Sequence, residues 1–223
     1  MKMYARLAFL FLGAFSLCIE AKITNLRFFG LWFGTGRDII LKFESTLVVP
    51  GPSPDAPGGT RVQAVWPGVQ GKGLLQNVIT IGDKKGEWWQ LPYYCCNPGK
   101  DLAAEVQVYP GDSITNTFIL NEATMEWQDN YAVTPGASAQ EPATDNTTTS
   151  SFIFDQAAVV DDDSTVGDHF TWTFMTIELQ GDGKWDFGPV AWRDILLGPV
   201  LNGGTKFNYT FSKPTASAVG IML

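Results

Sequence analysis

Residues 61–66 read Arg-Val-Gln-Ala-Val-Trp, and residues 105–108 read Glu-Val-Gln-Val. In both stretches apolar and polar side chains alternate, which is the period-two pattern of a strand with one buried face and one face in water. Neither stretch has the 3.6-residue spacing of an amphipathic helix, and no segment of the chain sustains that spacing over three turns. These two segments therefore predict β-structure.

Short segments rich in β-branched and aromatic residues recur along the chain about every 8 to 15 residues, each bounded by Gly, Pro, Asn or Asp. They predict strands over residues 38–49, 60–66, 74–81, 87–94, 104–109, 113–120, 124–132, 150–154, 169–179, 190–197 and 205–212. Stretches rich in proline or small polar residues predict loops over 50–59, 97–101 and 134–149. We expect an all-β protein, a two-sheet antiparallel β-sandwich that forms a single domain over residues 22–223.

The composition narrows the range of functions. The chain has 223 residues, 45% hydrophobic and 17% charged, with 8 Trp, 6 Tyr and 15 Phe, which excludes a disordered or collagen-like protein. A net charge of −8 without a basic stripe argues against nucleic acid as a partner. The single histidine, His169, excludes a cluster of imidazole ligands and limits any Ser-His or Cys-His pair to that residue. We therefore expect no metal and no cofactor, and the oligomeric state stays open.

Residues 1–21 have the features of a cleaved signal peptide. Lys2 and Arg6 precede an apolar run over residues 7–17, and small residues follow it up to Ala21. The run is too short to cross a bilayer comfortably, and no later segment approaches the length of a membrane span. The sequence therefore predicts a protein of the secretory pathway, secreted or lumenal, without a membrane span.

Two sequons for N-glycosylation, at Asn146 and Asn208, agree with secretion. Asn146 lies in a stretch of small and polar residues that is expected to be exposed. After cleavage the only cysteines left are Cys95 and Cys96, which are neighbours. Their Cα atoms, about 3.8 Å apart, are closer than in most disulfides. Secretion favours oxidation and geometry opposes it, so a disulfide and a pair of thiols both remain open.

Seven short runs of residues, taken together, match the order and spacing of a known protein family. They are residues 46–50 (Thr-Leu-Val-Val-Pro), 65–69 (Val-Trp-Pro-Gly-Val), 73–76 (Gly-Leu-Leu-Gln), 88–94 (Trp-Trp-Gln-Leu-Pro-Tyr-Tyr), 106–114 (Val-Gln-Val-Tyr-Pro-Gly-Asp-Ser-Ile), 174–178 (Phe-Met-Thr-Ile-Glu) and 185–190 (Trp-Asp-Phe-Gly-Pro-Val). Over about residues 38–197 this series resembles the eqolisins, or glutamic peptidases. Those are secreted fungal acid endopeptidases with a two-sheet sandwich of the concanavalin type. The resemblance implies catalytic roles for Gln76 and Glu178.

Such a pair has a definite chemistry. A carboxyl group on a strand, desolvated by aromatic neighbours, can act as a general acid or base. A neutral amide beside it can orient a water molecule or stabilise an oxyanion. We expect the two side chains to share a cleft with aromatic residues that bind the substrate. The candidates are Trp66, Trp88, Trp89, Tyr93, Tyr94, Trp127 and Trp172.

The chain also departs from the eqolisin pattern. Val78 stands where the family has a glycine, two residues after the catalytic glutamine, and Gln70 stands where the family has an acidic residue. The first expected strand begins at residue 38, which leaves no room for the propeptide that eqolisins carry after their signal. These differences weigh against a peptidase.

We therefore expect an enzyme that acts on a hydrophobic small molecule, by dehydration or cyclisation in secondary-metabolite biosynthesis. An aromatic cleft with one acid–base pair suits such a substrate, and it can promote cycloaddition by holding two reacting groups together. Small secretory-pathway proteins of this kind resemble the hetero-Diels–Alderases of fungal tropolone–sesquiterpenoid biosynthesis. The close alternative is an acid glutamic endopeptidase with a polypeptide substrate, and a lower alternative is a non-catalytic carbohydrate-binding sandwich.

Overall fold

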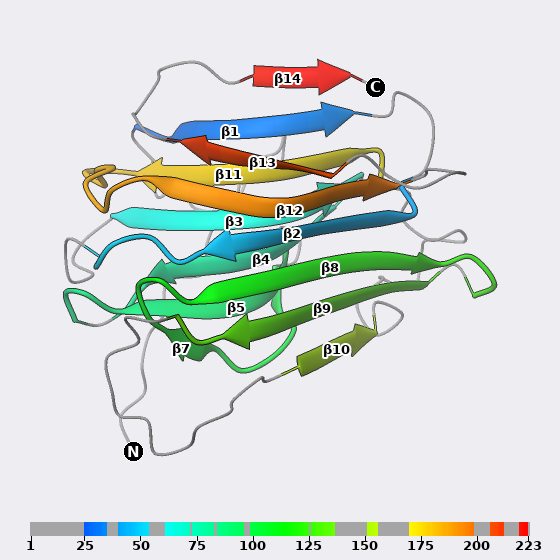
Figure 1. Ribbon diagram of the computed structural model, residues 1–223, viewed down its shortest axis with the longest axis horizontal. Helices are drawn as coiled ribbons and strands as arrows, with labels where there is room; N and C mark the ends of the chain where they lie inside the picture. The colour runs from blue at the N-terminus through cyan, green and yellow to red at the C-terminus, as the bar shows by residue number, and fades with distance from the viewer. Residues whose placement is uncertain are drawn as a thin grey trace.

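The computed structural model describes residues 25–34, 40–53, 61–71, 73–82, 84–95, 99–124, 126–136, 151–155, 170–198, 206–211 and 219–222, with the backbone alone for 151–155, 206–211 and 219–222. These residues form fourteen strands in two sheets that lie one over the other with their strands nearly aligned (Figure 1). The prediction of an all-β, two-sheet sandwich is confirmed. Neighbouring strands pair antiparallel except β1 and β14, which pair in parallel.

The first sheet carries the two predicted catalytic residues, Gln76 and Glu178. Its strand order is β14 (Val219–Met222), β1 (Arg27–Gly34), β11 (Trp172–Gln180), β3 (Val62–Gln70), β4 (Leu74–Ile81), β5 (Trp88–Cys95) and β6 (Lys100–Asp101), with β7 (Val106–Val108) also paired to β5. Because β11 lies between β1 and β3, a late segment of the chain is placed in the middle of strands formed by early segments.

The second sheet covers one face of the first. Its order is β10 (Ser151–Asp155), β9 (Glu126–Thr134), β8 (Ser113–Asn121), β2 (Lys42–Val48), β12 (Val190–Gly198) and β13 (Lys206–Phe211). The pairing of β12 with both of its neighbours shifts register around Arg193 and Asp194, and Asp194 has a positive φ of 49°. This is the signature of a β-bulge.

Most predicted strands correspond to observed ones, and residues 74–81 coincide with β4. Three strands were not predicted: β1, β6 and β14. The sequence of β1, Arg-Phe-Phe-Gly-Leu-Trp-Phe-Gly, is almost wholly apolar and contains two glycines, so it shows no alternation. The first strand therefore begins at Arg27 rather than at residue 38.

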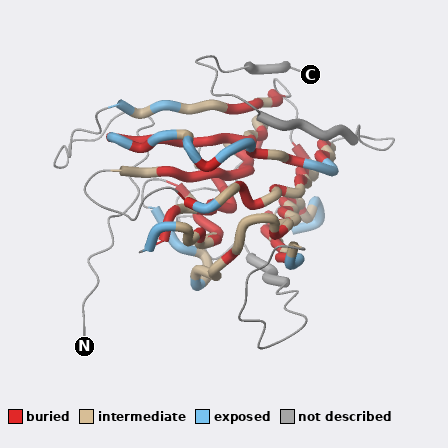
Figure 2. The backbone as a smooth tube through the Cα atoms, turned by 60° about the vertical axis from the view of Figure 1, so that its left-hand side comes forward, coloured by how far each residue is buried: buried red, intermediate tan, exposed pale blue. Residues whose placement is uncertain are grey.

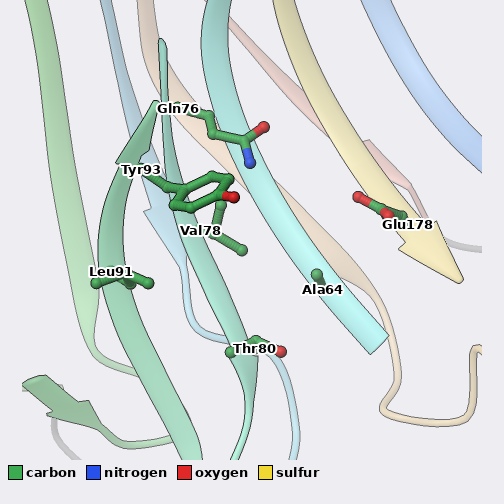
Figure 3. Close-up of a pocket in the computed structure, with 7 residues that line it drawn as sticks. All are labelled: Ala64, Gln76, Val78, Thr80, Leu91, Tyr93 and Glu178. Carbon is green, nitrogen blue, oxygen red and sulfur yellow. The ribbon is translucent and has the colours of Figure 1, made fainter. Parts of the chain in front are cut away.

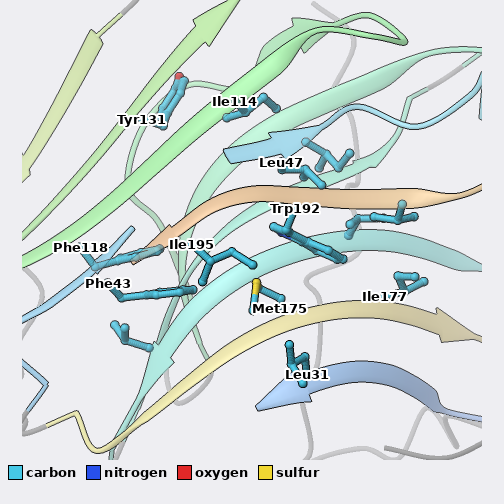
Figure 4. Packing of buried hydrophobic residues seen from close by; sticks show 14 of the residues in the cluster. Leu31, Phe43, Leu47, Ile114, Phe118, Tyr131, Met175, Ile177, Trp192 and Ile195 are labelled. Atoms are coloured by element: carbon cyan, nitrogen blue, oxygen red, sulfur yellow. The ribbon is translucent and has the colours of Figure 1, made fainter. Parts of the chain in front are cut away.

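The core fills the space between the sheets, where buried residues concentrate (Figure 2). Large side chains from both sheets meet there, including Met175 and Ile177 of β11 and Trp192 of β12 (Figure 4). Phe43 and Phe118 stack with ring centroids 5.9 Å apart and ring planes 8° apart. Burying side chains of this size contributes about 1.5–3 kcal/mol each, before the cost of ordering them.

One polar pair crosses this core. Asn77 of β4 donates a hydrogen bond of 2.7 Å from Nδ2 to Oδ1 of Asp129, which lies on β9 in the opposite sheet. Asp129 is 1% exposed, and its Oδ2 has no hydrogen-bond partner among the described residues. Burial raises the pKa of Asp129 to about 7, and the bond from Asn77 opposes that rise.

Several expectations fall outside what the structure describes. The signal peptide (1–21), Asn146 and His169 lie outside the described residues, and Asn208 lies in β13, where only the backbone is described. Cys95 is disulfide-bonded, and Cys96 is outside the described residues. In the part of the chain that is described, no helix is long and apolar enough to cross a membrane.

Candidate functional site

The two predicted catalytic residues lie on the face of the first sheet that points away from the core. Side chains alternate between faces along a strand, so Leu75 and Ile79 of β4 enter the core while Gln76 points outward. Met175 and Ile177 of β11 likewise enter the core, so Glu178 points outward on the same side as Gln76. We call this side of the first sheet the outer face.

The register fixes the relative position of the pair. Gln76 on β4 lies opposite Gly68 of the intervening strand β3, and Glu178 on β11 lies opposite Ala64 of the same strand. Trp66, which shares their face, comes between Gly68 and Ala64. In Figure 3 the amide of Gln76 and the carboxyl of Glu178 point toward one another over β3.

A small hollow lies between these two groups. It is lined by Ala64, Gln76, Val78, Thr80, Leu91, Tyr93 and Glu178 (Figure 3). The lining is mainly apolar, and the hollow has room for about one water molecule. A pocket for a drug-sized ligand is far larger, typically about 300–1,000 Å3.

Glu178 is buried and held by two hydrogen bonds. Its side chain is 1% exposed. Trp66 donates from Nε1 to Oε2 over 3.1 Å, and Gln180 donates from Nε2 to Oε1. Burial raises the pKa of Glu178 to about 7, because the charged form loses its hydration, and the two donors act against that rise. The carboxyl can therefore take up or release a proton near neutral pH.

Gln76 is buried as deeply, at 1% exposed, and its Oε1 has no hydrogen-bond partner among the described residues. A buried amide oxygen without a partner costs about 1–3 kcal/mol. The glycine opposite it makes room for this side chain, since a Cβ on Gly68 would lie 2.7 Å from the Leu75 carbonyl oxygen and 3.1 Å from Cβ of Gln76. An acceptor held beside a water-sized hollow is suited to bind a water molecule.

Four of the predicted aromatic residues share the outer face. Tyr93 lines the hollow, and Trp66 contacts Glu178 directly. Trp89 and Trp172 lie on the same face without lining the hollow: Trp89 is opposite Thr80, and the ring of Trp172 lies against Gly34. The structure thus brings Tyr93 and Trp66 together with Gln76 and Glu178.

The other three aromatic candidates point into the core between the two sheets. Trp88 and Trp127 are 0% and 1% exposed in the core, and Tyr94 packs against the same core. Trp88 donates from Nε1 to the carbonyl oxygen of Gly51 over 2.9 Å, and Trp127 packs on Phe170 with centroids 4.8 Å apart. The expected aromatic cleft therefore loses these three residues to core packing.

Sequence reasoning missed residues that shape the site. Gln180 was not considered, although it follows Glu178 by two residues and so had to share its face. Thr80 and Leu91 could have been found by the same period-two rule. Of the two departures from the eqolisin pattern, Val78 lines the hollow, whereas Gln70 lies opposite Trp172 and Leu74 at the far end of β3.

The described residues include no group of three or more His, Cys, Asp or Glu side chains that could hold a metal ion. The polar groups that line the hollow include the carboxyl group of Glu178 and the side-chain amide of Gln76. An ionised Glu178 can accept a proton from a water molecule in the hollow, and the amide of Gln76 can bind that water or a developing oxyanion.

No protein-family model and no curated protein matches the chain. Among solved structures, scytalido-glutamic peptidase with a peptide-based transition-state analogue aligns over 80% of this chain and 82% of that chain, at 15% identity and a TM-score of 0.49. A second structure of that peptidase with a transition-state analogue inhibitor gives 14% identity, 81% and 83% coverage and a TM-score of 0.49. SCP-B, a member of the eqolisin family in complex with the tripeptide Ala-Ile-His, gives 12%, 80% and 82%, and 0.42. At this distance the likenesses assign no role to any residue.

Proposed function

We propose that this chain is a hydrolase that adds water to a peptide carbonyl, with Glu178 as general base and then general acid, and with Gln76 as the group that binds water and oxyanion. One observation carries the proposal: the carboxyl of Glu178 and the unpartnered Oε1 of Gln76 face one another across a hollow with room for about one water molecule. The sequence resemblance to the eqolisins supports the same reaction.

The proposed reaction has two steps. Ionised Glu178 takes one proton from water, the resulting hydroxide forms a bond to the carbonyl carbon, and the side-chain amide of Gln76 donates to the oxyanion. Glu178 then gives its proton to the amide nitrogen, the carbon–nitrogen bond breaks, and a carboxylic acid and an amine leave. Hydrogen bonds to an oxyanion of this kind are worth about 10²–10³ in kcat.

The pH dependence follows from the state of Glu178. Hydrolysis starts from the ionised form, so kcat/KM is expected to rise as the pH increases through about 7. This range lies above the acidic range that the eqolisin resemblance implies. Burial of Glu178 in a mainly apolar hollow is the cause of the difference.

The test is cleavage of a denatured protein substrate from pH 3 to pH 9. We expect cleavage by the parent and a loss of at least about 10²-fold in Glu178→Gln, which keeps the shape and removes the base. Glu44→Gln on β2 of the other sheet is the matched control and is expected to cleave like the parent. A folded parent that cleaves no polypeptide at any pH overturns the proposal.

The second candidate function is turnover of a hydrophobic small molecule, by dehydration or cyclisation of the hetero-Diels–Alder type. It is favoured by the apolar cluster on the outer face, which consists of Ala64, Trp66, Leu74, Val78, Tyr93 and Cys95 with Phe28, Val62, Leu91 and Phe174 packed on it. Solvent extraction of the purified protein followed by mass spectrometry tests it. A bound apolar compound that the parent converts and Glu178→Gln does not convert would select this function. Sugar binding that survives Glu178→Gln would select a carbohydrate-binding protein instead.

We further propose that the protein enters the secretory pathway, with residues 1–21 removed and with glycans on Asn146 and Asn208. The charged start, the apolar run and the two sequons support this. Mass spectrometry of the expressed mature protein, before and after enzymatic deglycosylation, gives the cleavage point and the occupancy of each sequon. An N-terminus before residue 22 would contradict the cleavage.

A further inference from the structure

Gln180 donates one of the two hydrogen bonds that the carboxyl of Glu178 receives. It lies two residues further along β11, on the same outer face, and is 6% exposed. Its Nε2 donates to Oε1 of Glu178, while Nε1 of Trp66 donates to Oε2. Each oxygen of the carboxyl thus receives one hydrogen bond from a neutral donor.

The position of Gln180 is fixed by its backbone. It pairs with Val62 of β3, and its carbonyl oxygen accepts a hydrogen bond of 3.0 Å from the amide of Gly183 in the turn that follows. That turn is packed tightly, since a Cβ on Gly183 would lie 2.4 Å from the carbonyl oxygen of Val62. The donor is therefore held by the sheet and by the turn together.

We propose that Gln180 is a positioning residue for Glu178: by occupying one lone pair of Oε1, it orients the carboxyl so that its proton is taken up and released toward the hollow. This inference rests on the proposed role of Glu178 as an acid–base group. An ionised carboxylate has about four acceptor sites, of which Trp66 and Gln180 occupy two. The remaining sites are available to a water molecule in the hollow that Gln76 also lines.

The surroundings of Glu178 make this effect measurable. The residues opposite it on the flanking strands are Phe28 and Ala64, and neither is titratable. The other titratable group that lines the hollow is Tyr93, whose pKa is raised by burial and by Asp101. Near neutral pH the titration of the hollow therefore reports on Glu178.

The experiment follows the protonation of Glu178 by the infrared carbonyl band of its protonated carboxyl, identified by its absence in Glu178→Gln. In Gln180→Leu we expect the pKa of Glu178 to rise by about one to two units, because a hydrogen bond to a charged group that favours the ionised form is removed. Gln70→Leu, on the outer face at the far end of β3, is the matched control and is expected to leave the band unchanged. An unchanged pKa in a folded Gln180→Leu overturns the proposal.

A measurement on the parent needs no substitution. The side-chain amide resonances of Gln180 are expected to shift between the ionised and protonated forms of Glu178, with the same midpoint as the infrared band. Resonances that do not move through that range overturn the proposal even if Gln180→Leu fails to fold.

Activity distinguishes a positioning role from a merely structural one. If the protein cleaves polypeptides, Gln180→Leu is expected to lower kcat about tenfold or more with little change in KM, and to move the rising limb of the pH profile upward by the same one to two units. If the protein cleaves none, the proposed hydrolysis fails, and the infrared and resonance measurements still decide the role of Gln180.

Discussion

Replacing Asp129 by Asn is expected to stabilise the protein at alkaline pH and to leave its stability in acid almost unchanged. Asp129 lies between the sheets, 1% exposed, and accepts a hydrogen bond from Asn77 of the opposite sheet. Asn has the same shape, carries no charge at any pH, and can accept the same bond.

The magnitude follows from proton linkage. Burial raises the pKa of Asp129 from 3.8 to about 7, so between these values the native state keeps a proton that the unfolded chain has lost. A native state that binds more protons loses stability as the pH rises. Each pKa unit corresponds to about 1.4 kcal/mol, so the free energy of unfolding falls by about 4 kcal/mol from pH 4 to above pH 7 on account of this residue.

The assay is urea denaturation followed by tryptophan fluorescence at pH 4 and pH 8, at one ionic strength. The fall in unfolding free energy between the two pH values is expected to be smaller by about 4 kcal/mol in Asp129→Asn than in the parent. Glu122→Gln, in the exposed turn after β8, controls for the loss of one carboxylate. A variant that is destabilised equally at both pH values, or a parent whose stability does not fall, would refute the reasoning.

Three further predictions concern packing. Gly68→Ala is expected to destabilise the fold by about 1–3 kcal/mol and to displace Gln76, because the added methyl group meets the next strand; chemical denaturation and the cleavage assay measure the two effects. Phe118→Ala removes the ring stacked on Phe43 and is expected to cost about 3–5 kcal/mol, with a smaller loss showing that the core collapses to fill the space. Trp88→Phe removes one hydrogen bond in the core and is expected to cost about 1 kcal/mol without a change in KM. A raised KM in that variant would indicate that Trp88 contacts the substrate, against this prediction.

The candidate site could be predicted only in part. Gln76 and Glu178 were predicted because the collinear runs of sequence resemble those of the eqolisins, and the structure places both residues at one hollow. Trp88 and Trp127 were expected beside them because aromatic residues suit either a cleft or a core, and composition does not say which face of a strand they take. Gln180 was overlooked because a lone glutamine carries no signal until its neighbour Glu178 is considered.

The sequence by itself determined that the chain forms strands and where most of them run. Alternation over residues 61–66 and the punctuation by Gly, Pro, Asn and Asp are local properties, and local backbone preferences decide them. The strand β1 was not predicted from the sequence, because a nearly continuous apolar run shows no alternation of apolar and polar residues.

Only the tertiary structure decided which strands are neighbours. The meeting of Gln76 with Glu178 depends on the pairing of β11 with β3, which joins segments far apart in the chain. Such pairings follow from how two sheets bury their apolar faces together, a property of the whole chain and not of any window of it. The raised pKa of Glu178 has the same origin, because burial of a carboxyl exists only once the sheet around it has formed.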